Sequence, residues 1–361
     1  RNLVQVLQKK SYSKNTMKSI LYSGYANSGG TIIGLIFEEI EHAVVLPMEF
    51  RLLKERYGIC ELEDALFKTN DQDLIDLAIK DFEWLCQQYA NPLGRFRKTG
   101  YAYEKRSGNI FKDATRTYID SIIDFTYPKS WHFYDFKLNY IQLILQRSIK
   151  KIIKRTSYGN KQAYITYVDR DDFLKHTKYY LETIQRGFLH QQAKEQKRVV
   201  KDNSLIVLPK SIPLYSAIAM KQIVRYFNEC KIILIDRDPR DIFIEVSKGK
   251  QRNIQQSYNP LKRAQSFIQY YESLRADTEE IKTDSNILFL KFEDLVLDYS
   301  NQLNKIYNFL DISPQDHTFK GSMFRPDESV QNIGLWKKSH DLEAEAIKLI
   351  ESKLSNYLYN A

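Results

Sequence analysis

The chain has 361 residues, of which 43% are hydrophobic and 27% are charged, and its formal net charge at pH 7 is +9. This length predicts one large α/β domain with an elaboration, or two domains. No stretch approaches the ~20 uninterrupted apolar residues of a membrane-spanning helix, and the charge fits anionic partners of several kinds, including nucleic acid, lipid and acidic glycans.

Four short apolar runs predict buried strands, each followed by turn residues and then by helical periodicity. Continuous apolar runs of this length are typical of parallel strands covered on both faces. Alternation with helices predicts the α/β class, a parallel sheet flanked by helices, with ligands beyond the carboxyl ends of the strands. The runs are Ser19–Tyr25, Ser204–Leu208, Lys231–Ile235 and Asn286–Phe292, the last leading into a helical stretch over 293–310.

Between residues 71 and 203 the pattern changes to long amphipathic segments rich in Tyr, Phe and Lys. We interpret this range as a large helical insertion within a single domain over 1–361. Its basic run at 146–155 is compatible with a membrane surface or an anionic acceptor. A solvated helix face with Ile152 and Ile153 turned inward is the favoured alternative.

The stretch 20–34 combines a strand, a turn of small residues and a helix start. Gly24, Gly29 and Thr31 stand where a P-loop has its glycines and its hydroxyl. Small residues let backbone N–H groups converge on an anion, and a helix N-terminus adds its dipole. Gly30 replaces the P-loop lysine, so hydrolysis of ATP or GTP is not expected; the alternative is a plain strand-to-helix turn.

A second strand end, at 231–243, is followed by two arginines. Asp238–Pro239 suits the start of a helix, with the Asp as cap and the Pro in the first turn. Arg237 then lies at the sheet edge and presents a planar fork to a phosphate. For Arg240, an ion pair with Asp236 or Asp241 is at least as good an interpretation.

Together with two later motifs, these segments resemble the sulfotransferases that use 3′-phosphoadenosine 5′-phosphosulfate. The set looks like the bacterial enzymes of glycan sulfation and is similar to tyrosylprotein and heparan sulfotransferases. The resemblance covers roughly Lys18–Gly58 and Ser204–Lys338 and leaves the insertion unmatched. Its motifs, in the family's order, are the first loop, Arg237-Asp-Pro-Arg-Asp241, Leu290-Lys-Phe-Glu-Asp-Leu295, and the stretch Phe324–Lys337.

The resemblance implies a P-loop-like fold and a donor site built from three parts. Arg237 falls on the family's 3′-phosphate arginine, and Ser329, Asn332 and Lys337 are candidate contacts from the C-terminal segment. The family's 5′-phosphosulfate loop corresponds to Gly24, Tyr25, Ala26, Asn27, Ser28, Gly29, Gly30 and Thr31.

Two positions depart from the family pattern. Asn27 stands where the loop usually carries Lys or Arg, which removes a cation from the leaving phosphate. Glu245 stands eight residues after Arg237, where a serine that holds the 3′-phosphate is expected, and Ser247 follows two positions later. Either the helix is shifted or that contact is made differently.

Sulfuryl transfer needs a base for the acceptor proton. Glu49 lies in an apolar run next to a proline, where we expect desolvation to raise its pKa. It follows Thr31 by 18 residues, close to the interval of the catalytic glutamate in tyrosylprotein sulfotransferases, also in a Glu-x-Arg context. We therefore assign Glu49 as base and Arg51 to substrate binding. The rivals Glu38, Glu39 and Glu41 are interpreted as a solvated face.

Transfer also needs a cation at the leaving oxygen. Lys210 emerges at the end of a predicted strand and looks like the family's catalytic lysine; an ordinary surface lysine is the alternative. Ser211 and Ile212 follow it, whereas cytosolic small-molecule sulfotransferases continue with a histidine. That difference supports a glutamate base.

The resemblance implies a hydroxyl acceptor, which we expect to be a carbohydrate, in a polysaccharide, lipopolysaccharide or glycolipid, with peripheral membrane contact compatible. We assign acceptor binding to the insertion, with Trp131 as a stacking residue. A kinase of the P-loop type and a basic nucleic-acid-binding protein are the rival functions; we expect no nucleic-acid partner.

The cysteines and histidines show no pattern of a metal site or a disulfide framework. Three widely spaced cysteines and six scattered histidines predict no metal and a reducing compartment, which we take to be a bacterial cytoplasm.

Overall fold

The computed structural model describes residues 17–25, 27–92, 100–128, 138–152, 162–201, 203–212, 217–248, 259–276, 278–338 and 341–360. The chain divides into two compact units. The first unit is formed by Glu55–Gly187. The second unit is formed by the described residues up to Lys54 together with those from Phe188 onward.

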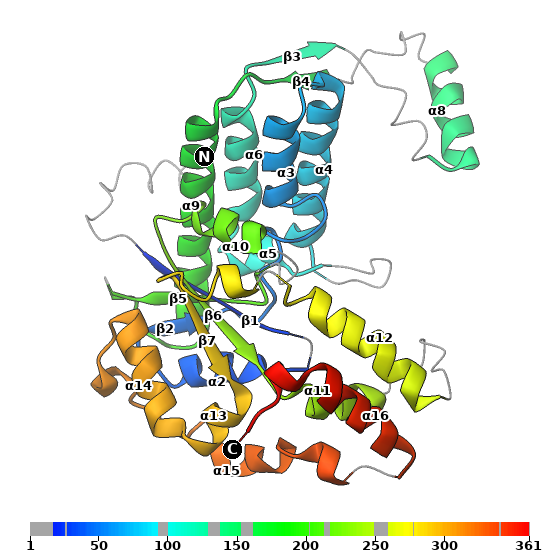
Figure 1. The fold of residues 1–361 in the computed structure, drawn as a ribbon. Helices are drawn as coiled ribbons and strands as arrows, with labels where there is room; N and C mark the ends of the chain where they lie inside the picture. Colours follow the sequence, from blue (N-terminus) through cyan, green and yellow to red (C-terminus); the bar gives the residue numbers. More distant parts are fainter. Residues whose placement is uncertain are drawn as a thin grey trace. The chain divides into compact units, whose positions relative to one another are not determined.

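A five-stranded parallel sheet forms the centre of the second unit (Figure 1). Its strands, in spatial order, are β2 (Ala43–Val45), β5 (Leu205–Pro209), β1 (Lys18–Gly24), β6 (Glu229–Asp236) and β7 (Ile287–Lys291). Every neighbouring pair is parallel. The predicted α/β class and the four predicted strands are confirmed, with strand ends moved by one or two residues.

The edge strand β2 was not predicted, because three residues give no periodicity to detect. Within β1, the neighbours Ile20 and Leu21 are both fully buried, so the sheet is covered on both faces there. The apolar runs of the sequence are thus strands with no solvent-exposed face.

The helices of this unit follow the strands. The predicted helix over 293–310 is two helices separated at Asp298. The helices are α2 (Thr31–Glu38), α10 (Ala217–Val224), α11 (Pro239–Lys248), α12 (Pro260–Ser273), α13 (Phe292–Leu297), α14 (Tyr299–Leu310), α15 (Pro326–Ser329) and α16 (Asp341–Lys353), and the short 3₁₀ turns are Thr278–Glu280, Pro314–Asp316, Val330–Asn332, Leu335–Lys338 and Ser355–Tyr357.

Two apolar clusters hold these helices in place. In the first, α2, α13 and α14 pack on one face of the sheet through residues such as Ile33, Leu295 and Ile306. In the second, α11, α12 and α16 pack on one another through Ile244, Ile268 and others. Each fully buried aliphatic side chain of this kind contributes about 1.5–3 kcal/mol to the stability of the fold.

The other unit is mainly helical. It contains α3 (Ile59–Lys68), α4 (Gln72–Ala90), α5 (Tyr103–Arg106), α6 (Phe111–Ser121) and α8 (Tyr140–Ile152), and α9 (Arg170–Glu195) begins in it. Two short antiparallel strands, β3 (Phe125–Pro128) and β4 (Gln162–Ile165), were not predicted. Many of its aromatic residues form the core; Tyr118, for example, stacks on Tyr180 with ring centroids 4.7 Å apart.

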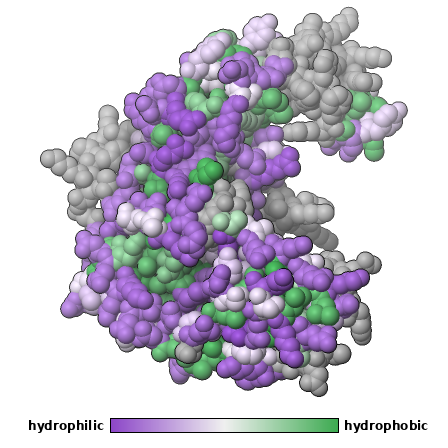
Figure 2. All heavy atoms as spheres, viewed as in Figure 1, coloured by the Kyte–Doolittle hydropathy of each residue, from purple (hydrophilic) through white to green (hydrophobic). Residues whose placement is uncertain are grey.

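The surface is mainly hydrophilic on the face drawn in Figure 2, with hydrophobic residues in small groups. Tyr140, Ile141 and Leu145 of α8 are among the exposed ones. The side chain of Ile152 and the whole of Ile153 lie outside the described residues, so the inward orientation predicted for them stays a prediction. No helix in the described part of the chain is long and apolar enough to cross a membrane.

Candidate functional site

The loop between β1 and α2 is folded tightly against the end of β6. Ser28 donates its backbone N–H to the Tyr25 carbonyl (2.9 Å) and its hydroxyl to the Ile235 carbonyl (2.9 Å). Within the described part of the chain, the N–H groups of Gly29, Gly30 and Thr31 donate to no protein oxygen. Such a run of N–H groups at a helix N-terminus is the geometry that receives a phosphate or sulfuryl oxygen.

Packing explains the glycines of this loop. Gly29 has a φ of +85°, and a Cβ there would lie 2.5 Å from the Phe292 ring. A Cβ on Gly24 would lie 2.4 Å from the Ser28 hydroxyl oxygen, and one on Gly30 would lie 3.1 Å from the Gly24 nitrogen. Gly30, at the position of the P-loop lysine, therefore lies against the backbone at the end of β1, where a side chain has little room. Ala26 of the same loop lies outside the described residues.

Arg237 lies where the sequence predicts it, directly after β6 and beside this loop. Its guanidinium donates to the backbone carbonyl of Asn27 (3.1 Å) and to that of Asn332 (2.6 Å). It also forms an ion pair with Glu245 and lies over the Phe292 ring, 4.8 Å from its centroid. Arg237 thus joins the first loop, α11 and the C-terminal segment.

Glu245 resolves the second departure from the family pattern. The helix α11 begins at Pro239 as predicted, and the Glu245 side chain points at Arg237. Position 245, where the family pattern has a serine, therefore carries a carboxylate that contacts Arg237. The alternative of a shifted helix is not needed, because α11 holds this position beside the arginine.

The C-terminal segment is fixed to the start of α11. The Asp241 carboxylate accepts the backbone N–H of Gly334 (2.8 Å) and of Trp336 (3.2 Å). Asn332 reaches Arg237 through its backbone carbonyl, Lys337 is exposed, and Ser329 is half-buried. Of the three candidate contacts in this segment, the structure brings Asn332 to Arg237.

Asp238 caps α11, as predicted. Its carboxylate accepts the backbone N–H of Arg240 at 2.8 Å, and the Arg240 guanidinium pairs with Asp238 (2.6 Å) and Glu351 (2.9 Å). The prediction that Arg240 pairs with Asp236 or Asp241 is wrong, because its side chain folds back on the cap. Burial raises the pKa of Glu293, which accepts the Asp238 N–H, to about 7.

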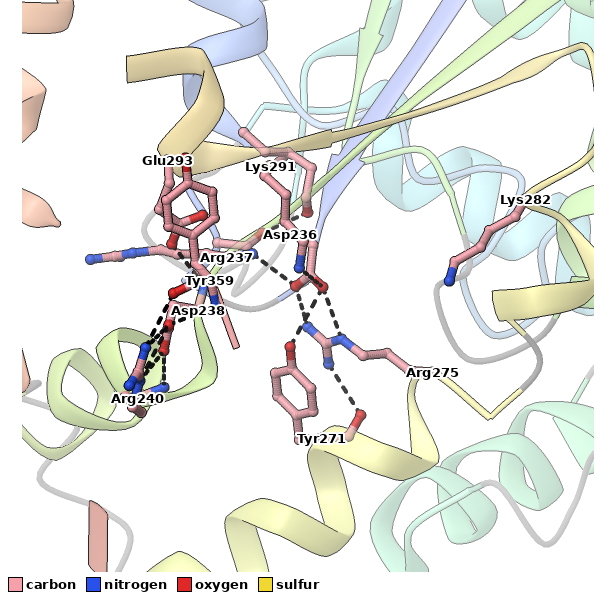
Figure 3. Close-up of polar contacts among 12 residues, drawn as sticks. Asp236, Arg237, Asp238, Arg240, Tyr271, Arg275, Lys282, Lys291, Glu293 and Tyr359 are labelled. Atoms are coloured by element: carbon pink, nitrogen blue, oxygen red, sulfur yellow. Dashed lines mark hydrogen bonds and ion pairs between the residues drawn. The ribbon is translucent and has the colours of Figure 1, made fainter. Parts of the chain in front are cut away.

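A second cluster at the same strand end was missed by the sequence analysis (Figure 3). Asp236 ends β6 and pairs with Arg275 (2.6 Å) and Lys291 (3.4 Å). Burial acts to raise the pKa of Asp236, but Arg275 and Lys291 outweigh it and hold that pKa below its usual value. Arg275 also lies 3.8 Å from the ring centroid of Tyr25, so the cluster supports the first loop. No motif marks Arg275, which lies in a turn after α12.

Glu49, Arg51 and Lys210 form one ion-paired group. Lys210 Nζ lies 2.7 Å from one carboxylate oxygen of Glu49, and an Arg51 nitrogen lies 2.7 Å from the other. Lys210 follows β5, and its backbone N–H donates to the Tyr22 carbonyl of β1 (2.8 Å). The three predicted residues thus lie together at the carboxyl edge of the sheet, Lys210 directly after β5 and Glu49 and Arg51 a few residues after β2.

The expectation of a raised pKa for Glu49 is wrong. Burial does act in that direction, but the hydrogen bonds and charges of Lys210 and Arg51 outweigh it and lower the pKa. The residues next to Glu49 in the sequence indicate its apolar setting, but they do not reveal the contact with Lys210, which is 161 residues away along the chain.

The interpretation of Glu39 as part of a solvated face is also wrong. Glu39 is buried, and its carboxylate accepts the N–H groups of Met323 and Phe324 (both 2.8 Å). Its other oxygen lies 2.7 Å from Nε2 of His317, whose Nδ1 lies 2.5 Å from the Tyr307 hydroxyl. Glu39 is therefore an anchor for the chain that leads into the C-terminal segment.

The remaining predicted site residue, Trp131, lies outside the described residues. Among the residues that the structure describes, no group of three or more His, Cys, Asp or Glu side chains could hold a metal ion. Cys60, Cys86 and Cys230 are buried free thiols.

Comparison with known proteins gives one family. A family model described as "Sulfotransferase family" matches residues 137–316. No curated protein matches the chain.

Similar solved structures include two sulfotransferase domains of biosynthetic enzymes and one mouse sulfotransferase. The sulfotransferase domain from the curacin biosynthetic pathway is 12% identical, with a TM-score of 0.43 over 96% of this chain and 100% of that one. The sulfotransferase domain from the Synechococcus PCC 7002 olefin synthase is 12% identical, with a TM-score of 0.42 over 98% of each chain. Mouse sulfotransferase SULT7A1 complexed with PAP is 18% identical, with a TM-score of 0.32 over 49% of this chain and 73% of that one.

Proposed function

We propose that this chain, which belongs to the sulfotransferase family, transfers the sulfuryl group of 3′-phosphoadenosine 5′-phosphosulfate to a hydroxyl group of a carbohydrate. One observation carries the proposal. The glycine loop, Arg237 and the group formed by Glu49 and Lys210 all lie at the carboxyl edge of one parallel sheet, where α/β proteins bind their ligands.

The residues at this edge fit the two phosphates of the donor. The N–H groups of Gly29, Gly30 and Thr31 suit the 5′-phosphosulfate, because they are donors at a helix N-terminus. Arg237 suits the 3′-phosphate. Its Nε is buried and has no hydrogen-bond partner among the described residues, so the guanidinium has a donor to offer in addition to Nη1, which Glu245 contacts.

Glu49 and Lys210 divide the chemistry between them. The donor supplies the sulfuryl group, and its S–O bond to the 5′-phosphate breaks as the acceptor oxygen bonds to sulfur. Glu49 accepts the proton of the acceptor hydroxyl, and Lys210 stabilises the negative charge on the leaving oxygen. Arg51 keeps its contact with Glu49 and holds the carboxylate in place.

The ion pair between Glu49 and Lys210 couples these two roles. Lys210 lowers the pKa of Glu49, which makes the carboxylate a weak base while the pair is intact. The Lys210 side chain is 59% exposed and can turn toward the leaving oxygen. When it does so, Glu49 loses the Lys210 cation and becomes a stronger base, so the base gains strength as the leaving group is stabilised.

The carbohydrate acceptor and a cytoplasmic site of action belong to the same proposal. The acceptor is supported by the likeness of the motif set to glycan sulfotransferases and by the net charge of +9, which favours acidic glycans. The three buried free thiols are compatible with a reducing cytoplasm.

Release of 3′-phosphoadenosine 5′-phosphate in the presence of acceptor tests the proposal. We expect release with oligosaccharides, measured against a phenol and a sterol, and we expect Lys210→Ala to lower kcat by about 10²-fold. The matched control is Lys305→Ala, which removes an exposed lysine on α14 and should keep full activity. Faster transfer to the phenol or the sterol would replace the carbohydrate assignment, and no release with any acceptor would contradict the enzyme assignment.

A further inference from the structure

Arg237 is a buried cation, and its only ion-pair partner among the described residues is the side chain of Glu245, which can turn away into solvent. The Arg237 side chain is 3% exposed, whereas the Glu245 side chain is 45% exposed. The other two partners of the guanidinium are backbone carbonyls, of Asn27 and Asn332, which carry no net charge. Glu245 is therefore the carboxylate in direct contact with this buried arginine, and Asp241 acts on it only through a longer-range charge interaction.

The two ends of this ion pair differ in freedom. Arg237 is held by the two carbonyls and by the Phe292 ring, so its guanidinium is fixed at the strand end. Glu245 lies in the second turn of α11, and its half-exposed side chain can rotate into solvent at little cost in packing. The Glu245 carboxylate is therefore the solvent-accessible member of the pair, and the guanidinium is the buried one.

We propose that the Glu245 carboxylate occupies the position on Arg237 that the 3′-phosphate of the donor takes, and that the donor has to displace it in order to bind. The inference rests on the proposed function, because it requires a donor with a 3′-phosphate. Phosphate and carboxylate carry the same sign of charge, so both cannot stay against one guanidinium without strong repulsion. Glu245 is thus an affinity-determining residue of the donor site.

Displacement has two linked consequences. In the donor-free protein the carboxylate stabilises Arg237 and, through it, the contacts to Asn27 and Asn332. In the donor-bound protein that stabilisation is lost. Removal of the charge at position 245 should therefore weaken the donor-free fold and strengthen donor binding, whereas loss of a purely structural contact would weaken both.

Calorimetric titration with 3′-phosphoadenosine 5′-phosphate tests the displacement. We expect Glu245→Gln and Glu245→Ser to bind it about tenfold more tightly than the wild type. Both should melt at a lower temperature without ligand. Affinity for adenosine 5′-phosphosulfate, which has no 3′-phosphate, should stay unchanged. Glu245→Asp keeps the charge and should lie between the wild type and Glu245→Gln.

Glu351→Gln is the matched control, because Glu351 is also a half-exposed carboxylate that pairs with an arginine, Arg240. It should change neither affinity. Wild-type or weaker binding of 3′-phosphoadenosine 5′-phosphate by the Glu245 variants would overturn the inference and leave the proposed function standing. Failure of the wild type and all variants to bind it would overturn the inference and the proposed function together.

Discussion

Glu39→Gln tests the anchor that fixes the chain before the C-terminal part of the site. The change keeps the shape of the side chain and removes its charge. Two backbone N–H bonds, from Met323 and Phe324, become bonds to a neutral oxygen, and the contact with His317 loses its charge assistance. A charge-assisted bond exceeds a neutral one by about 1 kcal/mol, so the three contacts together account for about 3 kcal/mol.

The effect should depend on pH in a defined direction. Burial acts to raise the pKa of Glu39, but the N–H groups of Phe324 and Met323 and the contact with His317 outweigh it, so the folded-state pKa lies below the usual 4.5. A lowered folded-state pKa gives stability that is complete above the unfolded-state value and is lost as the pH falls through the folded-state value. The gap between wild type and Glu39→Gln should therefore be full at pH 7 and shrink in acid.

Thermal unfolding of both proteins between pH 3 and pH 7 measures this gap. A loss of about 3 kcal/mol lowers the melting temperature by about 6–12 °C for a unit of roughly 200 residues. Glu41→Gln is the control: Glu41 is exposed and pairs with Lys201 at 3.0 Å, so its loss should cost under about 1 kcal/mol. Equal shifts for the two variants, or a gap that does not shrink in acid, would refute the reasoning.

Three further predictions concern the site. Glu293→Gln should remove a decline in stability that the wild type shows as the pH rises from 4.5 to about 7, because the raised folded-state pKa favours the protonated protein; melting curves across that range check it. Arg237→Ala should weaken 3′-phosphoadenosine 5′-phosphate by about 30-fold or more and adenosine 5′-phosphosulfate far less in calorimetric titrations, and equal weakening would argue against a 3′-phosphate contact. Glu49→Gln should lower single-turnover transfer by about 10²-fold at unchanged donor affinity, and near wild-type turnover would place the base elsewhere.

The sheet and the donor loop could be predicted because their signals are local. A strand buried on both faces is a continuous apolar run. Two of the loop glycines meet atoms of the loop itself, as Gly24 meets Ser28, although Gly29 also lies against the distant Phe292 ring. The start of α11 was equally predictable, since Asp238 and Pro239 are adjacent signals for one helix end.

The electrostatic state of the site could not be predicted because it depends on distant residues. Glu49 owes its lowered pKa to Lys210, and Glu39 is buried by a segment that begins 284 residues later. Arg275 carries no motif, yet it neutralises Asp236 across 39 residues. In each case the sequence identified a titratable residue, and only the fold supplies the partner that sets its charge.

The central position of β1 in the sheet determines how early the sheet can form during synthesis. β1 lies near the beginning of the described chain, but its two neighbours are β5 and β6, whose first residues are Leu205 and Glu229. At about 5–20 residues per second, a ribosome needs roughly 10–40 s to deliver those partners after β1 has left it. During that interval a strand buried on both faces in the finished sheet has neither neighbour, while helices within Glu55–Gly187 can pair locally. The donor loop is therefore among the first parts of the site to be synthesised and among the last to acquire its structure.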